Sequence, residues 1–315
     1  MKRLFAAAAL AAASLAAQAQ QGTIHFLVGF PAGAGLDTMT RLVAEKMQAS
    51  LGQTVVVENR TGAAGQIAMT ALKNSPADGS YLVMTPLVTV VTAPHIQQLP
   101  YDAFKDFAPV AHAANFLFAF VMGPHTPAKS VKEYIALVKQ DPKYGNYASA
   151  ATGSLPHLFS LVFASKAGIT MNHIGYRGTA AALTDLLGGQ IAAFMGTVSD
   201  VSALHKAGKV FAVATSGGTR AKSMIDVPTF KELGYNIEGG GWYAAYAPAG
   251  TPPATIDRLS KAIVAALHEP DVREKLEGFG MEPTGLGPEE LAKIQRHDYD
   301  FWGPIIKVAG FKPGG

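Results

Sequence analysis

Three short turns rich in glycine and alanine carry the clearest chemical signal in this sequence. They read FPAGAGLD at residues 30–37, NRTGAAGQ at residues 59–66 and SAATGSLPH at residues 149–157. Each turn precedes a helical pattern, so its backbone N–H groups lie at the N-terminus of a helix. Such N–H groups, together with the positive end of the helix dipole, favour a bound anion. A single glycine turn is usually only a turn, but three of one design predict a site for a small carboxylate.

Three ionisable side chains near these turns each admit a functional and a structural interpretation. Asp37 could contact a ligand or act as a base, but the N-cap of the following helix is the simpler role. His157 is more often a residue that fixes a loop than a catalyst. Arg177 suits bidentate binding of a carboxylate, and a surface ion pair explains it equally well.

The patterns of the common enzymes and metal proteins are missing. No G-x-S-x-G motif is present, and Ser154 and His157 are neighbours within one turn rather than parts of a triad. The nine histidines form no H-E-x-x-H zinc motif. Gly33 and Gly35 could start a dinucleotide fingerprint, but its third glycine is absent. The sequence therefore predicts no catalytic residue, no metal and no cofactor.

The elements that must position the turns alternate between strands and helices. Apolar runs predict strands at 24–28, 54–57, 81–84, 147–149, 171–174, 191–195 and 210–214. Helical patterns follow most of them, and Ser130-x-x-Glu133 is a capping box that opens a helix reaching Lys139. The alternation favours an α/β fold with a parallel-type sheet, and the last third is expected to be helical.

The N-terminus has the pattern of a secretory signal peptide. Lys2 and Arg3 precede an apolar stretch from Leu4 to Ala17, and Ala17-Gln18-Ala19 is a small-x-small cleavage site. The apolar stretch is short for a membrane anchor. We therefore expect residues 1–19 to be removed and the product to be released into the periplasm.

Composition limits the partners. Removal of 19 of the 315 residues leaves 296, enough for two domains, and takes the net charge from +3 to +1. A nearly neutral chain without a basic run is not expected to bind nucleic acid. The chain has no cysteine, so its stability must come from its core rather than from disulfides.

The order and spacing of several motifs resemble one family. The motifs are VGFPAGAGLD with Arg41, VVVENRTGAAGQ, SPADGSYLVM, PYDAFKDFAPV, YASAATGSLPHL, HIGYRGTAAALTDLLGGQI, VPTFKELG and YAPAGTP. Together they resemble the periplasmic receptors of tripartite tricarboxylate transporters, the TctC/Bug type, over the whole mature chain. The resemblance implies a receptor that binds a small carboxylate, hands it to a membrane permease and works as a monomer.

The resemblance also implies a two-domain, Venus-flytrap fold of the periplasmic binding protein type (type II-like). The expected domains are 20–122 with 245–315, and 123–244, with hinge crossings near 118–122 and 240–247. The expected ligand contacts come from both domains. They are Phe30, Pro31, Ala32, Gly33, Ala34, Asp37, Gly62, Ala64, Gly65, Gln66, Thr85, Leu87, Ser149, Thr152, Ser154, His157, Tyr176, Arg177, Thr197 and Asp200.

Two departures from the family pattern bear on the ligand. Leu36 stands where the family often has Ser or Thr, and the stretch TPLVTVVTAP is apolar where the family is often polar. With Phe30, Tyr176 and Trp242 near the site, they favour a carboxylate with an apolar body, such as an aromatic carboxylate or terephthalate, over citrate. A periplasmic enzyme and a ligand-presenting module for a membrane kinase are the alternative functions.

Overall fold

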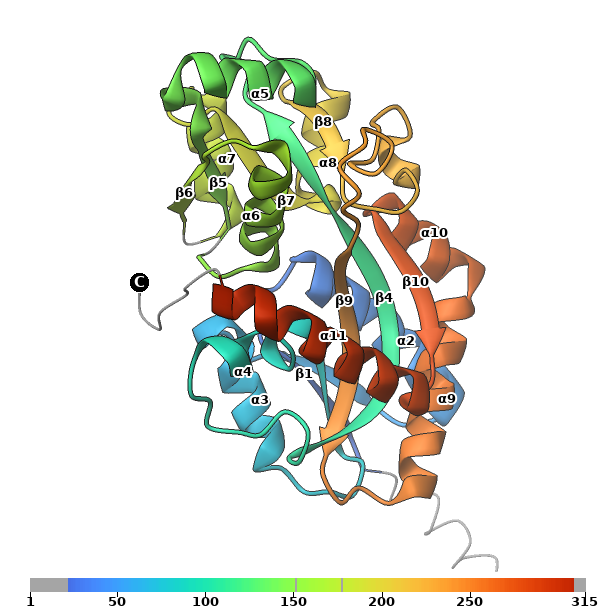
Figure 1. Ribbon diagram of the computed structural model, residues 1–315. Coiled ribbons are helices and arrows are strands. Elements are labelled where there is room, and N and C mark those ends of the chain that lie inside the picture. Colours follow the sequence, from blue (N-terminus) through green and yellow to red (C-terminus); the bar gives the residue numbers. More distant parts are fainter. Residues whose placement is uncertain (1–21, 151, 177, 309–315) are drawn as a thin grey trace, which may run out of the picture.

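The computed structural model describes residues 22–150, 152–176 and 178–308, and Arg177 lies outside them. Within this part the strands form one mixed sheet in the order β2-β1-β3-β9-β4-β7-β5-β6, and β8 and β10 each pair with β4. Figure 1 shows two parts, one above the other, with β4 and β9 running between them. The described residues contain no helix that is long and apolar enough to cross a membrane.

The lower part is built on three parallel strands, β1 (Ile24–Val28), β2 (Val55–Asn59) and β3 (Tyr81–Pro86). Successive side chains of a strand point to opposite faces. Phe26 and Val28 therefore pack with α2 (Gly35–Leu51) and α9 (Pro253–His268), while Leu27 packs on the face of α3 (Gln66–Lys73) and α11 (Pro288–Val308). The turns that follow β1 and β2 lead directly into α2 and α3, as the sequence predicts.

The upper part repeats this plan. Strand β5 (Asn146–Ser149) lies parallel to β6 (Asn172–Gly175) and β7 (Ala193–Thr197), and β8 (Phe211–Thr215) pairs with β4. The helices are α5 (Val131–Gln140), α6 (Leu155–Ala167), α7 (Thr179–Leu187) and α8 (Val198–Lys206). Ser130 caps α5 by accepting a hydrogen bond from the Glu133 N–H at 3.2 Å, which confirms one half of the predicted capping box. The other half differs, because Glu133 Oε2 accepts from the Lys129 N–H at 2.7 Å.

Two long strands join the parts. Strand β4 (Phe107–Met122) pairs with β9 (Gly240–Pro248) up to Leu117, and from Phe118 onward it pairs with β7 and β8. The change of partner therefore falls at the start of both segments predicted to be hinge crossings.

Three further elements lie in the lower part. They are α4 (Ala93–Ile96), α10 (Pro270–Gly278) and β10 (Met281–Leu286). Strand β10 lies in the last third of the chain, so the prediction of a helical last third was wrong there. The two parts also touch away from the strands: a Cβ on Gly280, just before β10, would lie 2.7 Å from Val198 Cγ1 in α8.

Candidate functional site

The first two glycine turns lie against each other at the carboxyl ends of β1 and β2. A Cβ added to Gly29 would lie 2.6 Å from the Gly65 Cα, so only glycine permits this approach. A Cβ on Gly65 would in turn lie 3.0 Å from Thr89 Cγ2 and 3.1 Å from the Phe30 ring. Backbone rather than side chains therefore forms this surface, and the N-termini of α2 and α3 are brought together on it.

The second turn has an unusual backbone. Gly62, Ala63, Ala64 and Gly65 all have positive φ values, and those of the two alanines are 45° and 51°. A left-handed conformation is costly for a residue with a Cβ, and such residues cluster at functional sites. Ala64 is exposed and precedes α3, which has no side-chain cap. The turn is closed by its own backbone, since the Gly65 N–H donates to the Gly62 carbonyl at 3.0 Å and the Gln66 N–H to the Ala63 carbonyl.

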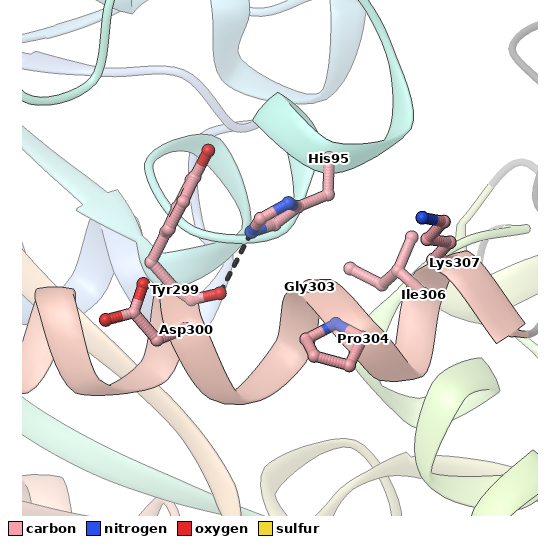
Figure 2. A pocket seen from close by; sticks show the side chains of 7 residues that line it. All are labelled: His95, Tyr299, Asp300, Gly303, Pro304, Ile306 and Lys307. Atoms are coloured by element: carbon pink, nitrogen blue, oxygen red, sulfur yellow. Dashed lines mark hydrogen bonds between the residues drawn. The ribbon is translucent and has the colours of Figure 1, made fainter.

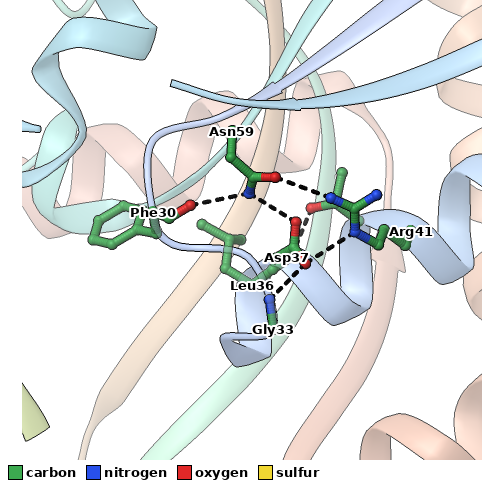
Figure 3. A network of polar contacts seen from close by, with 7 residues as sticks. Phe30, Gly33, Leu36, Asp37, Arg41 and Asn59 are labelled. Atoms are coloured by element: carbon green, nitrogen blue, oxygen red, sulfur yellow. Dashed lines mark hydrogen bonds and ion pairs between the residues drawn. The ribbon is translucent and has the colours of Figure 1, made fainter. Parts of the chain in front are cut away.

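Asp37 organises the first turn (Figure 3). Its Oδ2 accepts hydrogen bonds from the Gly33 N–H at 2.8 Å and Arg41 Nε at 3.0 Å, and its Oδ1 accepts one from Asn59 Nδ2 at 2.8 Å. Burial opposes ionisation of Asp37, but these donors outweigh it and lower its pKa. Asp37 is only 2% exposed.

The prediction of Asp37 as an N-cap was wrong. The cap position of α2 is Ala34, and Asp37 lies inside the first turn of the helix. Its carboxylate accepts hydrogen bonds from the first turn, from α2 and from the end of β2, so it holds the turn in place. The first N–H groups of α2 have no partner within the helix and no side-chain cap, so they remain available to an anion.

In the upper part, the third turn surrounds a stacked pair of histidines. The rings of His157 and His173 lie 3.6 Å apart and nearly parallel. His173 Nε2 lies 2.7 Å from Ser149 Oγ, and the Gly153 N–H donates to His157 Nδ1 at 3.0 Å. Burial and the His173 ring lower the pKa of His157 to about 3, and burial lowers that of His173 to about 4. Both rings are neutral near pH 7 and fix the turn.

Thr197 and Asp200 form the capping box of α8. Thr197 Oγ1 accepts from the Asp200 N–H at 3.3 Å, and Asp200 Oδ2 accepts from the Thr197 N–H at 3.2 Å and from Thr179 Oγ1 at 3.3 Å. Burial raises the pKa of Asp200 against these hydrogen bonds. Helices α6 and α7 have no side-chain cap, so their first N–H groups resemble those of α2 and α3.

Tyr243 on β9 is a candidate site residue that the sequence did not indicate. It lies on β9 opposite Pro86, and its ring lies 4.5 Å from that of Phe116. Burial and the negative charge of Asp200, a residue of α8, raise the pKa of its phenol. The sequence reasoning named Trp242 instead. Alternation along the strand turns Trp242 to the other face, where its Nε1 donates to Asp298 Oδ2 at 2.8 Å.

The predicted residues divide by exposure. Several turn residues are exposed or half-buried: Phe30, Pro31, Ala32, Gly33, Ala34, Gly62, Ala64, Gln66, Thr152, Ser154, Tyr176 and Thr197. Leu36 and Leu87 are instead buried in the lower core, and the hydroxyl of buried Thr85 lies 2.7 Å from that of Thr89. Leucine side chains at 36 and 87 therefore do not line the surface, contrary to the expectation. Of that apolar stretch, Val88 and Pro94 stay half-buried.

A pocket on α11 contains none of these residues (Figure 2). His95, Tyr299, Asp300, Gly303, Pro304, Ile306 and Lys307 line it. The rings of His95 and Tyr299 lie 4.0 Å apart and tilted by 36°, and His95 Nε2 donates to the Tyr299 carbonyl at 2.9 Å. This arrangement ties α4 to α11 and does not resemble the anion-suited turns.

Comparisons with known proteins agree on one family. The model of the tripartite tricarboxylate transporter family receptor matches residues 39–311. Protein BugT of Bordetella pertussis is 32% identical over 294 residues, which cover 92% of this chain and 90% of that protein.

Solved structures agree with the sequence comparison. The periplasmic binding protein BugD superimposes with a TM-score of 0.82 at 30% identity, covering 93% of this chain and 99% of BugD. Rpa4515 of R. palustris, solved with adipate, gives 0.85 at 27% identity, covering 92% and 98% of the two chains. MatC from Rhodopseudomonas palustris, solved with bound malate, gives 0.80 at 28% identity, covering 91% and 99%.

Proposed function

This chain belongs to the family of tripartite tricarboxylate transporter receptors, and we propose that it captures a small organic carboxylate between its two parts. It is a solute receptor of the periplasmic binding protein fold and not an enzyme. The proposed anchor is the pair of turns before α2 and α3. The proposed opposite wall is the turn before α6, the start of α7 and the Thr197–Asp200 box.

The observation that carries this proposal is the close approach of the two lower turns. Gly29 and Gly65 meet backbone to backbone, so two uncapped helix N-termini converge on one surface. Each terminus presents N–H donors and partial positive charge. The described arginines beside these turns already have partners, since Arg41 donates to Asp37 and Asn59 and Arg60 donates to Glu58. The carboxylate is therefore held by backbone groups.

For the ligand, we propose a dicarboxylate with a short apolar body. The upper wall offers hydroxyl groups and helix N–H groups for a second acid group, while Phe30, Val88 and Tyr243 supply a modest apolar lining. An aromatic diacid such as terephthalate is the second candidate. Its support is reduced because Leu36, Leu87 and Trp242 do not contribute to that lining. Adipate and malate, found in the structures of two relatives, are the natural first probes.

A ligand panel tests this function. Adipate, malate, terephthalate, benzoate, glutamate and citrate are titrated separately, with thermal unfolding as a parallel readout. A ligand at about 100 times its dissociation constant raises the stability by about 2.7 kcal/mol. We expect the dicarboxylates to bind best and to be recovered chemically unchanged. Tight binding of citrate or glutamate alone would contradict the proposed ligand class, and sustained turnover would contradict the receptor role.

The proposal extends to the setting of the receptor. We propose that residues 1–19 are cleaved on export, that the product is a periplasmic monomer and that it serves a tripartite tricarboxylate permease. The N-terminal pattern and the family support these points. Mass spectrometry of the exported protein tests the cleavage, with Gln20 as the expected first residue.

A further inference from the structure

A second cavity lies on the face of β9 opposite Tyr243. Its volume is about 840 Å³, within the usual range of small-molecule sites. Its walls come from α6 and the loops at 217–218 and 236–239 of the upper part, and from α11 and β10 of the lower part. None of the turn residues discussed above lines it, so it is separate from the proposed carboxylate site.

Aromatic side chains form much of the wall. Trp242, Trp302 and Phe159 are 4%, 7% and 3% exposed, and Phe301 stands at the rim, 52% exposed. The rings of Phe301 and Trp302 meet edge to face at 5.3 Å. Aromatic faces carry negative charge density and attract cations.

The ionised side chains of the wall have an acidic balance. Glu238, Glu282 and Asp298 line the cavity, with Lys166 as the lysine at its edge. Glu238 is already paired with Lys231 at 2.8 Å, and Asp298 accepts the Trp242 N–H. Glu282 forms no ion pair with any residue the structure describes. A bound cation could therefore pair with the Glu282 carboxylate without displacing another charged side chain.

A buried histidine adds a hydrogen-bonding group to the aromatic and acidic side chains of the cavity wall. His112 is 2% exposed, and its ring lies 5.5 Å from that of Trp242. Thr284 Oγ1 lies 3.1 Å from the His112 carbonyl oxygen and 2.7 Å from His112 Nδ1. With the single hydroxyl hydrogen donated to the carbonyl, Thr284 Oγ1 accepts from His112 Nδ1, which carries the ring proton. His112 Nε2 is then an acceptor without a partner among the described residues, in the wall of the cavity. It can receive an N–H.

We propose that this cavity binds a small organic cation, a protonated amine with an apolar or aromatic body. The ammonium group would lie near Glu282 and donate to His112 Nε2, and the body would lie against Trp242 and Trp302. A carboxylate would face three acidic side chains, so the anionic solute of the other site is excluded. A quaternary ammonium could use the aromatic wall but has no N–H for His112.

The chain supplies its own reporter for this site. Its two tryptophans, Trp242 and Trp302, both line the cavity. Three probes of one shape differ only in charge: 2-phenylethylamine, 2-phenylethanol and phenylacetate. We expect the amine to change the tryptophan emission saturably and to bind at least about tenfold more tightly than the alcohol, with calorimetry as the second readout.

Two variants locate the binding. Glu282→Gln removes the unpaired carboxylate from an exposed position and should weaken amine binding about tenfold while leaving the alcohol unaffected. Glu289→Gln, also exposed but outside the cavity wall, is the matched control and should leave both unchanged. Equal affinity for the amine and the alcohol, no saturable amine signal at millimolar concentrations, or equal effects of the two variants would each overturn the proposal.

Discussion

Asp37 shows how a side chain next to a ligand-binding turn can serve the turn alone. Its carboxylate holds Gly33, Arg41 and Asn59 in one network. Asp37→Asn would place amide hydrogens against the donors of Gly33 and Arg41 or, with the amide flipped, against that of Asn59, so we expect a loss of about 2 kcal/mol in the free energy of unfolding. Chemical denaturation at neutral pH measures it.

The matched control for Asp37 is Asp257→Asn. Asp257 pairs with Lys261 on the surface of α9 at 2.7 Å, and such exposed pairs contribute little. Because the pKa of Asp37 is lowered in the folded protein, its contribution exists above the unfolded pKa and is lost as the pH falls through the folded pKa. Equal losses in both variants at neutral pH would contradict the structural role of Asp37.

Three histidines with lowered pKa values predict a loss of stability in mild acid. The pKa values of His112, His157 and His173 are lowered to about 4, 3 and 4, with burial as the main cause. The unfolded chain therefore binds more protons below about pH 6.5, and each histidine lowers the stability by about 1.4 kcal/mol per pH unit until its folded pKa is reached.

Denaturation across this pH range tests the histidine prediction. His157→Gln should make the decline shallower by the share of one histidine, whereas His268→Gln, at an exposed position, should not change it. A stability that is constant from neutral pH to about pH 4.5 would show that the rings are not held neutral in the folded state.

At the scale of elements, the local patterns predicted most strands and helices because their periodicity is local. The Ser130 cap of α5 and the glycine turns before α2 and α3 belong to this class. Strand β4 does not, because FAPVAHAANFLFAFVM is apolar on both faces and shows no alternation. Its pairing with β9, about 130 residues later, is a tertiary property, and so the facing of Trp242 and Tyr243 could not be predicted.

The same limit applies to the site. The sequence indicated which turns could bind an anion, since glycine and alanine before a helix are a local signal. It did not indicate that the side chains of Leu36 and Leu87 point into the core, because residue type alone does not determine whether an apolar side chain on a turn faces the core or the surface. The sequence also did not show whether Asp37 stands at the N-cap of α2 or inside its first turn, because these two positions are only three residues apart.

The cap of α5 offers a prediction at this scale. Ser130→Ala removes the acceptor of the Glu133 N–H and should lower the stability by about 1 kcal/mol without affecting ligand affinity. Ser50→Ala, near the end of α2, is the control, since its hydroxyl only donates to the Met47 carbonyl at 3.2 Å. A change in carboxylate affinity in Ser130→Ala would indicate that α5 takes part in binding.

At the scale of the whole molecule, we predict that ligand binding changes the shape of the protein, because its two parts are joined through the strands β4 and β9 and can move as a hinge. Binding groups on both parts must meet one small molecule, so saturation should favour a closed arrangement. Small-angle scattering should then give a smaller radius of gyration with the best carboxylate than without it. An unchanged profile at saturation would contradict a hinged mechanism.

The central claim, that backbone turns hold the carboxylate, is tested most directly by a pair of glycine variants. Gly33 and Gly52 flank the two ends of α2, have φ values of 81° and 63°, and would each place a Cβ in open space. Valine at either position should therefore cost a similar amount of stability, about 1–2 kcal/mol.

Calorimetric titration of the best dicarboxylate into both variants separates binding from strain. We predict that Gly33→Val weakens binding about tenfold or more, because it distorts the turn that presents the N–H groups of α2, while Gly52→Val binds like the wild-type protein. Equal affinity in the two variants would contradict the claim that this turn anchors the ligand.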